Sequence, residues 1–413
     1  MLLRVDADLL IPGRGEPVRD GTVVADGDTI AYAGPTAGAP AVPPASLRVP
    51  VVMPGLWDCH GHFLGVRRAS LEDIAHDPVA VAAARITADA RLALDAGFTS
   101  VREPGGLGIH LARAIDEGTV PGPHVYAAGA ILSTTGGHGD LHSLPLRWVG
   151  DICHEHRGLW HCDGVPECLR AVRVQLRMGA RLIKVCTSGG VASELDHPLH
   201  QQFSDEELTA IVEEAGRAER VVAAHCHGKA GIMSALLAGV RTIEHGSYLD
   251  EEAVAAMLET GAVLVPTRFV VERLLAMKDE LPDYVDRKVR ALADRHQESL
   301  ELAIRSGVAI ALGTDSFTSG SGTAVPWGRN GEEITHLVAA GLPPLGAIEA
   351  ATAAAPATLG PQAPRSGLLA EGYDADLIAL AADPISDVTV LADPANVTHV
   401  WKGGVEMKAA RIA

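Results

Sequence analysis

Histidine pairs follow short apolar segments at two separated points of the chain. One apolar segment ends in Asp58-Cys59-His60-Gly61-His62. Side chains two residues apart on a strand point to the same side, so His60 and His62 can chelate one metal ion. An isolated His-x-His pair is a weak indication, because such pairs also occur without a metal.

Further metal donors follow later apolar segments. His225 and His227 lie in AAHCHG, His245 follows the apolar stretch before it in TIEHG, and Asp315 lies in ALGTDS. For each residue alone, a packed core histidine or a helix-capping aspartate is the commoner explanation. These donors therefore count as a metal site only if the fold brings them together.

Lys184 lies inside the apolar run LIKVCTSGG. A lysine that points into a protein interior is costly unless it is neutralised or paired. One interpretation is a salt bridge to an inward acid. The other is a carbamate, formed when CO2 adds to the neutral amine, which gives a carboxylate able to bridge two cations.

The elements that must position these residues are repeated strand–helix units. Apolar β-branched segments are predicted strands at 51–58, 98–103, 124–131, 181–187, 220–226, 241–246, 262–267 and 308–314. Alanine-rich amphipathic segments are predicted helices at 79–96, 164–179, 205–218, 229–238, 250–260 and 281–306. Eight strands with helical crossovers predict an α/β fold of the (β/α)8 TIM-like barrel type.

Short strands at both ends of the chain predict a small second domain. We expect residues 1–50 and 356–413 to pair as one β-sandwich domain, with a hairpin turn at Asp26 and Gly27, and residues 51–355 to form the catalytic barrel.

In such a barrel, side chains at the carboxyl ends of the strands share one face. The donors that would meet there are His60, His62, Lys184, His225, His245 and Asp315. Such a ring rarely arises by accident, so the sequence predicts a binuclear metal site.

Composition excludes several other classes. The 413 residues carry a net charge of −18, which disfavours nucleic-acid and anionic membrane surfaces. The sequence contains no run of 18 apolar residues, so no membrane span is expected. The N-terminal segment does not resemble a secretion signal. The six cysteines lack paired spacing and are expected to be ordinary thiols. We therefore expect a soluble, cytoplasmic protein, with a homo-oligomer possible.

Several motifs together resemble the metal-dependent amidohydrolase superfamily, namely VVMPGLWDCHGHF, LDAGFTSVRE, GARLIKVCTSGG, VVAAHCHGKAGI, RTIEHGSYLD, IALGTDS, EAATAAAPATLG and GYDADLIAL. The nearest group is the imidazolonepropionase-related hydrolases, which include Xaa-Pro dipeptidases and ochratoxin-hydrolysing amidases. The resemblance runs from about residue 5 to about residue 405. It implies the same barrel with a small β domain.

The resemblance also implies roles for individual residues. His60, His62 and Asp315 would hold one divalent metal, most simply zinc, and His225 and His245 would hold the other. Carbamylated Lys184 would bridge the two metals.

Three more residues match substrate-contacting positions of the peptidase-like relatives: His138, His227 and Tyr248. They imply a substrate with a carboxylate near the cleaved bond, such as a dipeptide, an N-acyl amino acid or a peptide C-terminus.

Two segments depart from the pattern of the relatives. Many relatives have a His-Gly pair where this chain has Trp327-Gly328-Arg329-Asn330. Residues 135–164 form an unusually polar, histidine-rich insertion. Both are expected on the active face, where they bear on the substrate and not on the type of reaction.

The expected reaction is amide hydrolysis at a pair of cations that acidify a shared water. Asp315 would accept the proton from water and pass it to the leaving nitrogen, and His138 would stabilise the oxyanion. The alternatives are a peptide-tailoring amidohydrolase of the kind that removes a follower peptide in bottromycin biosynthesis, a mononuclear cyclic amidase or deaminase, and a catalytically inactive binding protein.

Overall fold

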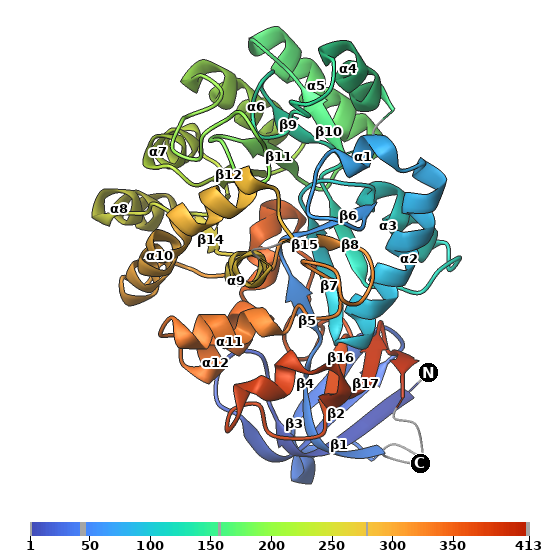
Figure 1. Cartoon of the computed structure of the whole chain (residues 1–413). Helices are drawn as coiled ribbons and strands as arrows, with labels where there is room; N and C mark the ends of the chain where they lie inside the picture. The colour runs from blue at the N-terminus through green and yellow to red at the C-terminus, as the bar shows by residue number, and fades with distance from the viewer. Residues whose placement is uncertain (1, 42–46, 156–157, 278–279, 410–413) are drawn as a thin grey trace.

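The computed structural model describes residues 2–41, 47–155, 158–277 and 280–409. Strands from the two ends of the chain pair in one sheet of order β18-β17-β16-β4-β1-β2-β3. These strands are β1 (Leu2–Leu10), β2 (Val18–Asp26), β3 (Thr29–Pro35), β4 (Leu47–Pro54), β16 (Leu377–Leu380), β17 (Val397–Lys402) and β18 (Val405–Lys408). The sheet lies below the rest of the molecule in Figure 1, and both ends of the chain lie beside it.

The predicted sandwich is one sheet that curls on itself. The amide of Ile30 donates to the carbonyl of Tyr373, and the amide of Ala375 donates to the carbonyl of Asp28. These bonds join the β3 edge to the segment before β16, over a separate apolar cluster that includes Trp401. The predicted hairpin is confirmed, since β2 ends at Asp26 and Gly27 has a φ of +62°.

The barrel strands form three further sheets. Their members are β5 (Leu56–Asp58), β7 (Phe98–Glu103) and β8 (His124–Ala127); β9 (Ile131–Ser133), β10 (Leu159–His161), β11 (Ile183–Cys186), β12 (Val222–Cys226), β13 (Thr242–His245) and β14 (Val263–Val265); and β6 (Gly61–Val66) with β15 (Ser316–Thr318). The pairings within these sheets are parallel, as expected for strands joined by helical crossovers.

Backbone hydrogen bonds join the first two of these sheets and the segment 308–314 into a ring. The amide of Arg181, just before β11, donates to Ala127 at the end of β8, and the amide of Ala311 donates to Leu264 in β14. The amide of Cys59, just after β5, donates to Leu312 and closes the circle. The predicted (β/α)8 barrel is therefore confirmed.

Three predicted strands differ in detail. The segment 51–58 is divided at Gly55 into the end of β4, which pairs in the sheet of the chain ends, and β5, which pairs in the barrel. The segment 308–314 makes only an isolated bridge, between Ile310 and Leu264, although it completes the ring. The segment 124–131 is divided into β8 and β9, because Gly129 between them has a φ of +81°, which a strand does not accommodate.

Helices cover the outside of the barrel (Figure 1). They are α1 (Asp73–His76), α2 (Val79–Asp95), α3 (Gly108–Asp116), α4 (Leu146–His154), α5 (Val165–Met178), α6 (Asp205–Arg217), α7 (Lys229–Ala238), α8 (Glu251–Thr260), α9 (Arg268–Ala276), α10 (Asp283–Arg305), α11 (Glu332–Ala339) and α12 (Pro344–Ala350). The six predicted helices are confirmed as α2, α5, α6, α7, α8 and α10. Local signals set their ends: Ser204 and Glu207 form a capping box that starts α6, and left-handed Gly179 ends α5.

The polar insertion at 135–164 contains α4 and β10, although residues 156 and 157 lie outside the described part of the chain. β10 pairs in parallel with β9 and so extends the barrel sheet on its outer edge. The insertion is therefore part of the folded domain.

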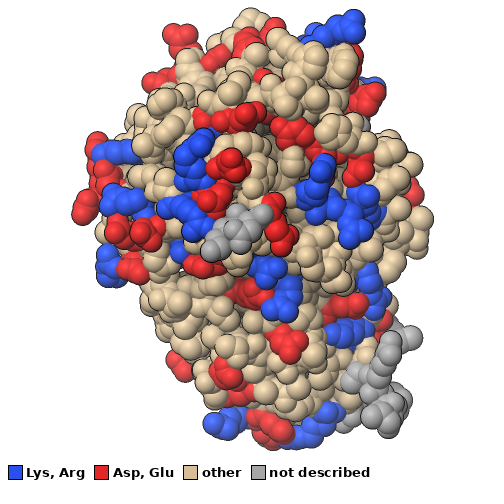
Figure 2. Space-filling model, viewed as in Figure 1, with Lys and Arg blue, Asp and Glu red and all other residues tan. Residues whose placement is uncertain are grey.

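Charged side chains of both signs share the face of the molecule that Figure 2 draws. On the face drawn in Figure 2, basic side chains alternate with acidic ones and do not gather into one basic patch. Within the four described ranges, no helix is both long and apolar enough to cross a lipid bilayer.

Candidate active site

The first group of metal donors combines His60, between β5 and β6, and His62, in β6, with Asp315, just before β15. The Nε2 atoms of His60 and His62 lie 3.2 Å apart. An Oδ1 atom of Asp315 lies 3.2 Å from Nε2 of His62 and 3.6 Å from Nε2 of His60. Two imidazole nitrogens and one carboxylate oxygen thus converge from opposite ends of the barrel sequence.

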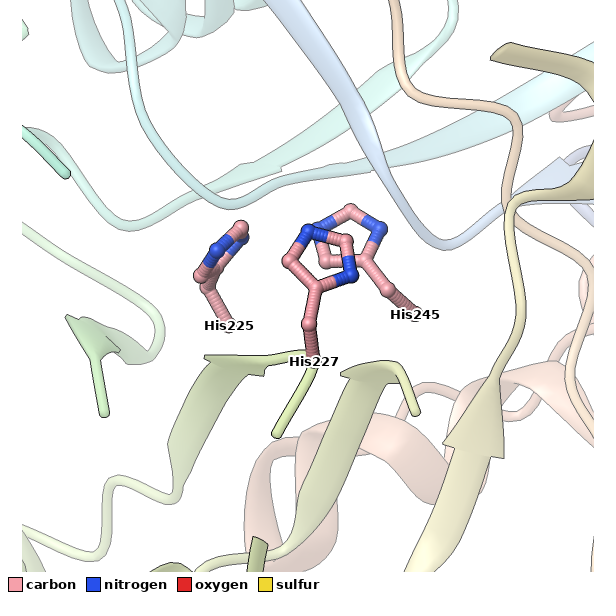
Figure 3. A group of neighbouring side chains, drawn as sticks. All are labelled: His225, His227 and His245. Atoms are coloured by element: carbon pink, nitrogen blue, oxygen red, sulfur yellow. The ribbon is translucent and has the colours of Figure 1, made fainter. Parts of the chain in front are cut away.

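The second group lies at the ends of β12 and β13. The ring nitrogens of His225, His227 and His245 lie within 4.8 Å of one another, and all three residues are buried. Figure 3 shows the three rings above the ends of their strands, facing a common space. By distance alone, His227 is as close to this group as the two predicted ligands.

The two groups adjoin each other and Lys184. The ring centres of His60 and His245 are 5.0 Å apart. The Lys184 side chain is 2% exposed, and its Nζ has no hydrogen-bond partner among the described residues. Among the described residues it also forms no salt bridge to an inward acid, which was one of the two interpretations of this residue. An amine without a partner inside a barrel is a costly arrangement that a further bound group would relieve.

Hydrogen bonds to the far side of each ring fix which nitrogen faces the site. Nδ1 of His60 lies 2.6 Å from Glu244, and Nδ1 of His62 lies 2.6 Å from the carbonyl of Gly105. When Nδ1 carries the proton, Nε2 keeps the lone pair that a metal needs.

The second group is oriented in the same way. Nδ1 of His245 lies 2.7 Å from the hydroxyl of Thr267, which leaves Nε2 toward the site. His225 is reversed: its Nε2 lies 3.3 Å from the carbonyl of Gly189, so Nδ1 is the free nitrogen. Each predicted histidine ligand therefore presents one available nitrogen.

Backbone conformation at the site is strained. His245, Thr267 and Asp315 have φ values of 69°, 56° and 59°, in the left-handed region that non-glycine residues rarely adopt. Such conformations persist where the surrounding structure enforces them, and they concentrate at functional sites.

Burial sets the charge states of the site. Burial lowers the pKa of the Lys184 ammonium, which favours the neutral amine. Burial also lowers the pKa of His60 to about 4, so its ring is neutral at pH 7. Desolvation alone would raise the pKa of Asp315, but His60 and His62 outweigh it and hold that pKa below the ordinary value. Neutral imidazoles and an ionised carboxylate are the forms that bind a cation.

His138 and Tyr248 differ in their relation to the site. The His138 ring stacks on His225 with a centre-to-centre distance of 4.1 Å. The Tyr248 hydroxyl lies 3.5 Å from the carbonyl of Ala291, and its ring packs against the apolar cluster of α9 and α10. Tyr248 is absent from the residues that line the cavities at the donors, so its substrate contact stays a prediction.

Two small apolar cavities of about 70 Å³ each meet at the donors. We name one the valine lobe, with walls from Val191, Val270, Val271, Leu274, Val285, Val289 and Leu292. The other is the leucine lobe, with walls from Leu64, Leu71, Ile131 and Leu159. His138, His225, His245, Asp315 and Phe317 line both lobes, so the polar groups lie between two apolar walls.

Sequence reasoning missed the residues that support the ligands. Arg102 donates two hydrogen bonds of 2.7 Å to Glu244, and both side chains are fully buried. Asp58 accepts from the amide of His60 and from the side chain of Asn330. The sequence did carry a signal for Arg102 and Glu244, since each is a charged residue inside an apolar segment, FTSVRE and RTIEHG.

Residues 327–330, which depart from the pattern of the relatives, pack behind the first donor group. Trp327 stacks on Phe63 with ring centres 4.2 Å apart, and Asn330 donates to Asp58 at 2.6 Å. Since Asp58 also accepts from the backbone of His60 and of Thr314, the segment helps to fix both ends of the first donor group.

Comparisons with known proteins agree with this architecture. Residues 51–407 match the model of the Amidohydrolase family. An ochratoxinase from Aspergillus niger is 46% identical over 98% of this chain and 86% of its own length. Its crystal structure has a TM-score of 0.92 and 44% identity, and covers 100% of this chain and 96% of that chain.

A second structure is that of a prolidase complexed with N-methylphosphonate-L-proline, with a TM-score of 0.90 and 33% identity over 99% of this chain and 100% of that chain. A Xaa-Pro dipeptidase with bound methionine in its active site has a TM-score of 0.86 and 30% identity over 99% of this chain and 100% of that chain. The chain belongs to the amidohydrolase family.

Proposed function

We propose that this protein is a binuclear metal-dependent hydrolase that cleaves an amide or peptide C–N bond in a substrate with a nearby carboxylate. The observation that carries the proposal is the position of Lys184 Nζ, buried and without a hydrogen-bond partner among the described residues, beside two converging groups of metal donors. A single donor group would not need this lysine.

The donor set fits two divalent cations. His60, His62 and Asp315 would hold one, and His225 and His245 would hold the other, with zinc suited to this mixed ligation. CO2 would add to the neutral amine of Lys184, forming an N–C bond and releasing one proton. The resulting carbamate would supply a carboxylate able to bind both cations, and it would remove the basic amine from the barrel interior.

When bound, the cations would activate water and polarise the amide carbonyl. The protein's own side chains would transfer the protons and stabilise the developing negative charge. Asp315, partly exposed to the cavities and ionised, accepts the proton from the attacking water and delivers it to the leaving nitrogen. His138 lies at the junction of the two lobes, where, with both ring nitrogens protonated, it would donate from Nε2 to the carbonyl oxygen as negative charge develops there.

The lobes indicate the substrate class. An amide held between the valine lobe and the leucine lobe would place an apolar group on each side of the cleaved bond. This agrees with relatives named ochratoxinase and prolidase. His227 lines the valine lobe and is the proposed contact for the substrate carboxylate. An apolar N-acyl amino acid or dipeptide satisfies these conditions.

The test is a mass-spectrometric screen of the zinc-loaded protein. It would include Xaa-Pro and other dipeptides, N-acyl amino acids, ochratoxin-like amides and macrocyclic peptides, with a chelated sample as control. We expect chelator-sensitive hydrolysis of substrates that are apolar on both sides, and much weaker hydrolysis of the same compounds with the carboxylate amidated. Failure of folded, metal-loaded protein to cleave any amide would overturn the proposal. A cytoplasmic location and assembly into a homo-oligomer stay predictions.

A further inference from the structure

The loop after β11 holds His138 in place through Ser193 and Asp196. Nδ1 of His138 lies 2.8 Å from the hydroxyl oxygen of Ser193. That hydroxyl in turn donates a short hydrogen bond to Oδ1 of Asp196. Ser193 is 3% exposed and the Asp196 side chain is 4% exposed, so this chain of bonds is shielded from water.

The direction of the proton follows from the chemistry of Ser193. A serine hydroxyl has one proton to donate, and here the acceptor is the Asp196 carboxylate. The bond to His138 must therefore run the other way, from Nδ1–H to the serine oxygen. Nε2 of His138 is then the nitrogen left for the cavities that this ring lines.

Lys288, on α10, anchors the loop. Its Nζ donates to the carbonyl oxygens of Ser193 at 2.6 Å and Asp196 at 2.7 Å, and to that of Gly190 at 3.1 Å. It also lies 3.1 Å from Oδ1 of Asp196. A single ammonium thus fixes the backbone and neutralises the carboxylate. The same helix supplies Val285, Val289 and Leu292 to the valine lobe.

Two further contacts hold His138 from the same loop. The side chain of Gln202 accepts from the amide of His138 at 3.0 Å and donates to Asp196 at 3.3 Å. A Cβ placed on Gly190 would lie 2.2 Å from Nδ1 and Cε1 of His138, so the backbone approaches the ring as closely as only glycine allows. The loop therefore contacts the ring edge, the ring face and the backbone of His138.

We propose that Ser193, Asp196 and Lys288 are positioning residues for catalysis: they keep the His138 ring stacked on His225, with Nδ1–H donated to Ser193 and Nε2 directed to the substrate. The proposal rests on the proposed amide hydrolysis for its catalytic consequence. Its structural part, the orientation of the ring, can be tested without any activity.

The kinetic test compares His138→Ala, Ser193→Ala and the double variant in the zinc-loaded full chain. Loss of His138 should lower kcat by about a hundredfold to a thousandfold. We expect Ser193→Ala to lower kcat by about tenfold or more with little change in KM or metal content, and Ser193→Thr, which keeps a hydroxyl, to restore most of it. The double variant should be no slower than His138→Ala, because Ser193 acts only through that ring.

Lys288→Met should lower kcat in the same way as Ser193→Ala, with little change in KM or metal content. Arg287→Met is the matched control, because Arg287 is its exposed neighbour on α10. We expect Arg287→Met to keep the wild-type kcat. Additive losses in the double variant, or an unchanged kcat in Ser193→Ala, would overturn the proposal.

A crystal structure of metal-free Ser193→Ala separates this inference from the proposed function. We expect the His138 ring to leave its stacked position on His225. A ring that stays in place would overturn the positioning role even if the wild-type protein hydrolyses amides. Conversely, the ring could be displaced in the variant while the wild-type protein cleaves no amide. That result would support the positioning role and reject the proposed reaction.

Discussion

Nδ1 of His60 lies 2.6 Å from Oε2 of Glu244, and both side chains are almost completely removed from solvent. Burial alone would raise the pKa of Glu244, but Arg102, which holds the same carboxylate, together with His60 and Lys184 outweighs it, so that pKa falls well below the ordinary value. A buried carboxylate behind a histidine ligand fixes the ring and strengthens its free nitrogen as a donor. The metal affinity of the first donor group should therefore depend on a residue that touches no metal.

Replacing Glu244 with Gln should weaken metal binding by about tenfold to a hundredfold. The change also leaves Arg102 buried without a counter-charge, at a cost of about 3–5 kcal/mol in the free energy of unfolding. The double variant Arg102→Met/Glu244→Gln removes that charge and separates the two effects. Chelator competition measures the affinity and thermal unfolding of the metal-free protein measures the stability. Wild-type affinity in both variants would refute the supporting role.

Replacing Asp315 with Asn should lower turnover by about a hundredfold to ten-thousandfold, because the amide cannot take the proton from water. Metal content should change little, since the amide oxygen remains as a donor. Elemental analysis measures the metal content, and steady-state kinetics on the same preparation measures the turnover. Turnover at the wild-type level would exclude Asp315 as the proton carrier.

Lys184 should make activity depend on CO2. Burial lowers the pKa of its ammonium, so at neutral pH the amine is more readily available for carbamate formation than on a free lysine. Metal-free protein freed of CO2 should regain activity with zinc far faster when bicarbonate is present. Lys184→Met should lose most activity and show no response to bicarbonate. An equal recovery of the wild type without bicarbonate would argue against the carbamate.

The stability of the fold should depend on Glu333, which accepts from the amides of Arg268 and Phe269 at the start of α9. Burial raises the pKa of Glu333 from 4.5 to about 8. A raised pKa in the folded state stabilises the protein fully below pH 4.5, and this stabilisation is lost as the pH rises toward 8.

The free energy of unfolding of the wild type, relative to Glu333→Gln, should therefore fall between these pH values by up to about 1.4 kcal/mol per pH unit. Urea unfolding of the metal-free proteins across this range measures it, with Glu371→Gln, an exposed change, as control. A difference that stays constant with pH would contradict the assignment.

The sequence was sufficient to predict the barrel and to single out the six proposed donors because their signals are local: His60 and His62 lie two residues apart, and Lys184 is conspicuous within an apolar run. The partners of those donors could not be found in this way. Lys288 lies 95 residues from Ser193 and its contact depends on how α10 packs on the loop after β11. The packing of Tyr248 was also not predictable, since its place in a motif does not reveal that its ring packs against the apolar cluster of α9 and α10.

The most direct test of the two-cation site is a titration of the metal-free protein with zinc, following bound metal and amide hydrolysis together. We predict that activity rises to a plateau at two zinc ions per chain, and that Lys184→Met binds fewer than two and stays almost inactive. Full activity at one zinc ion per chain would contradict the binuclear site and favour a mononuclear amidase.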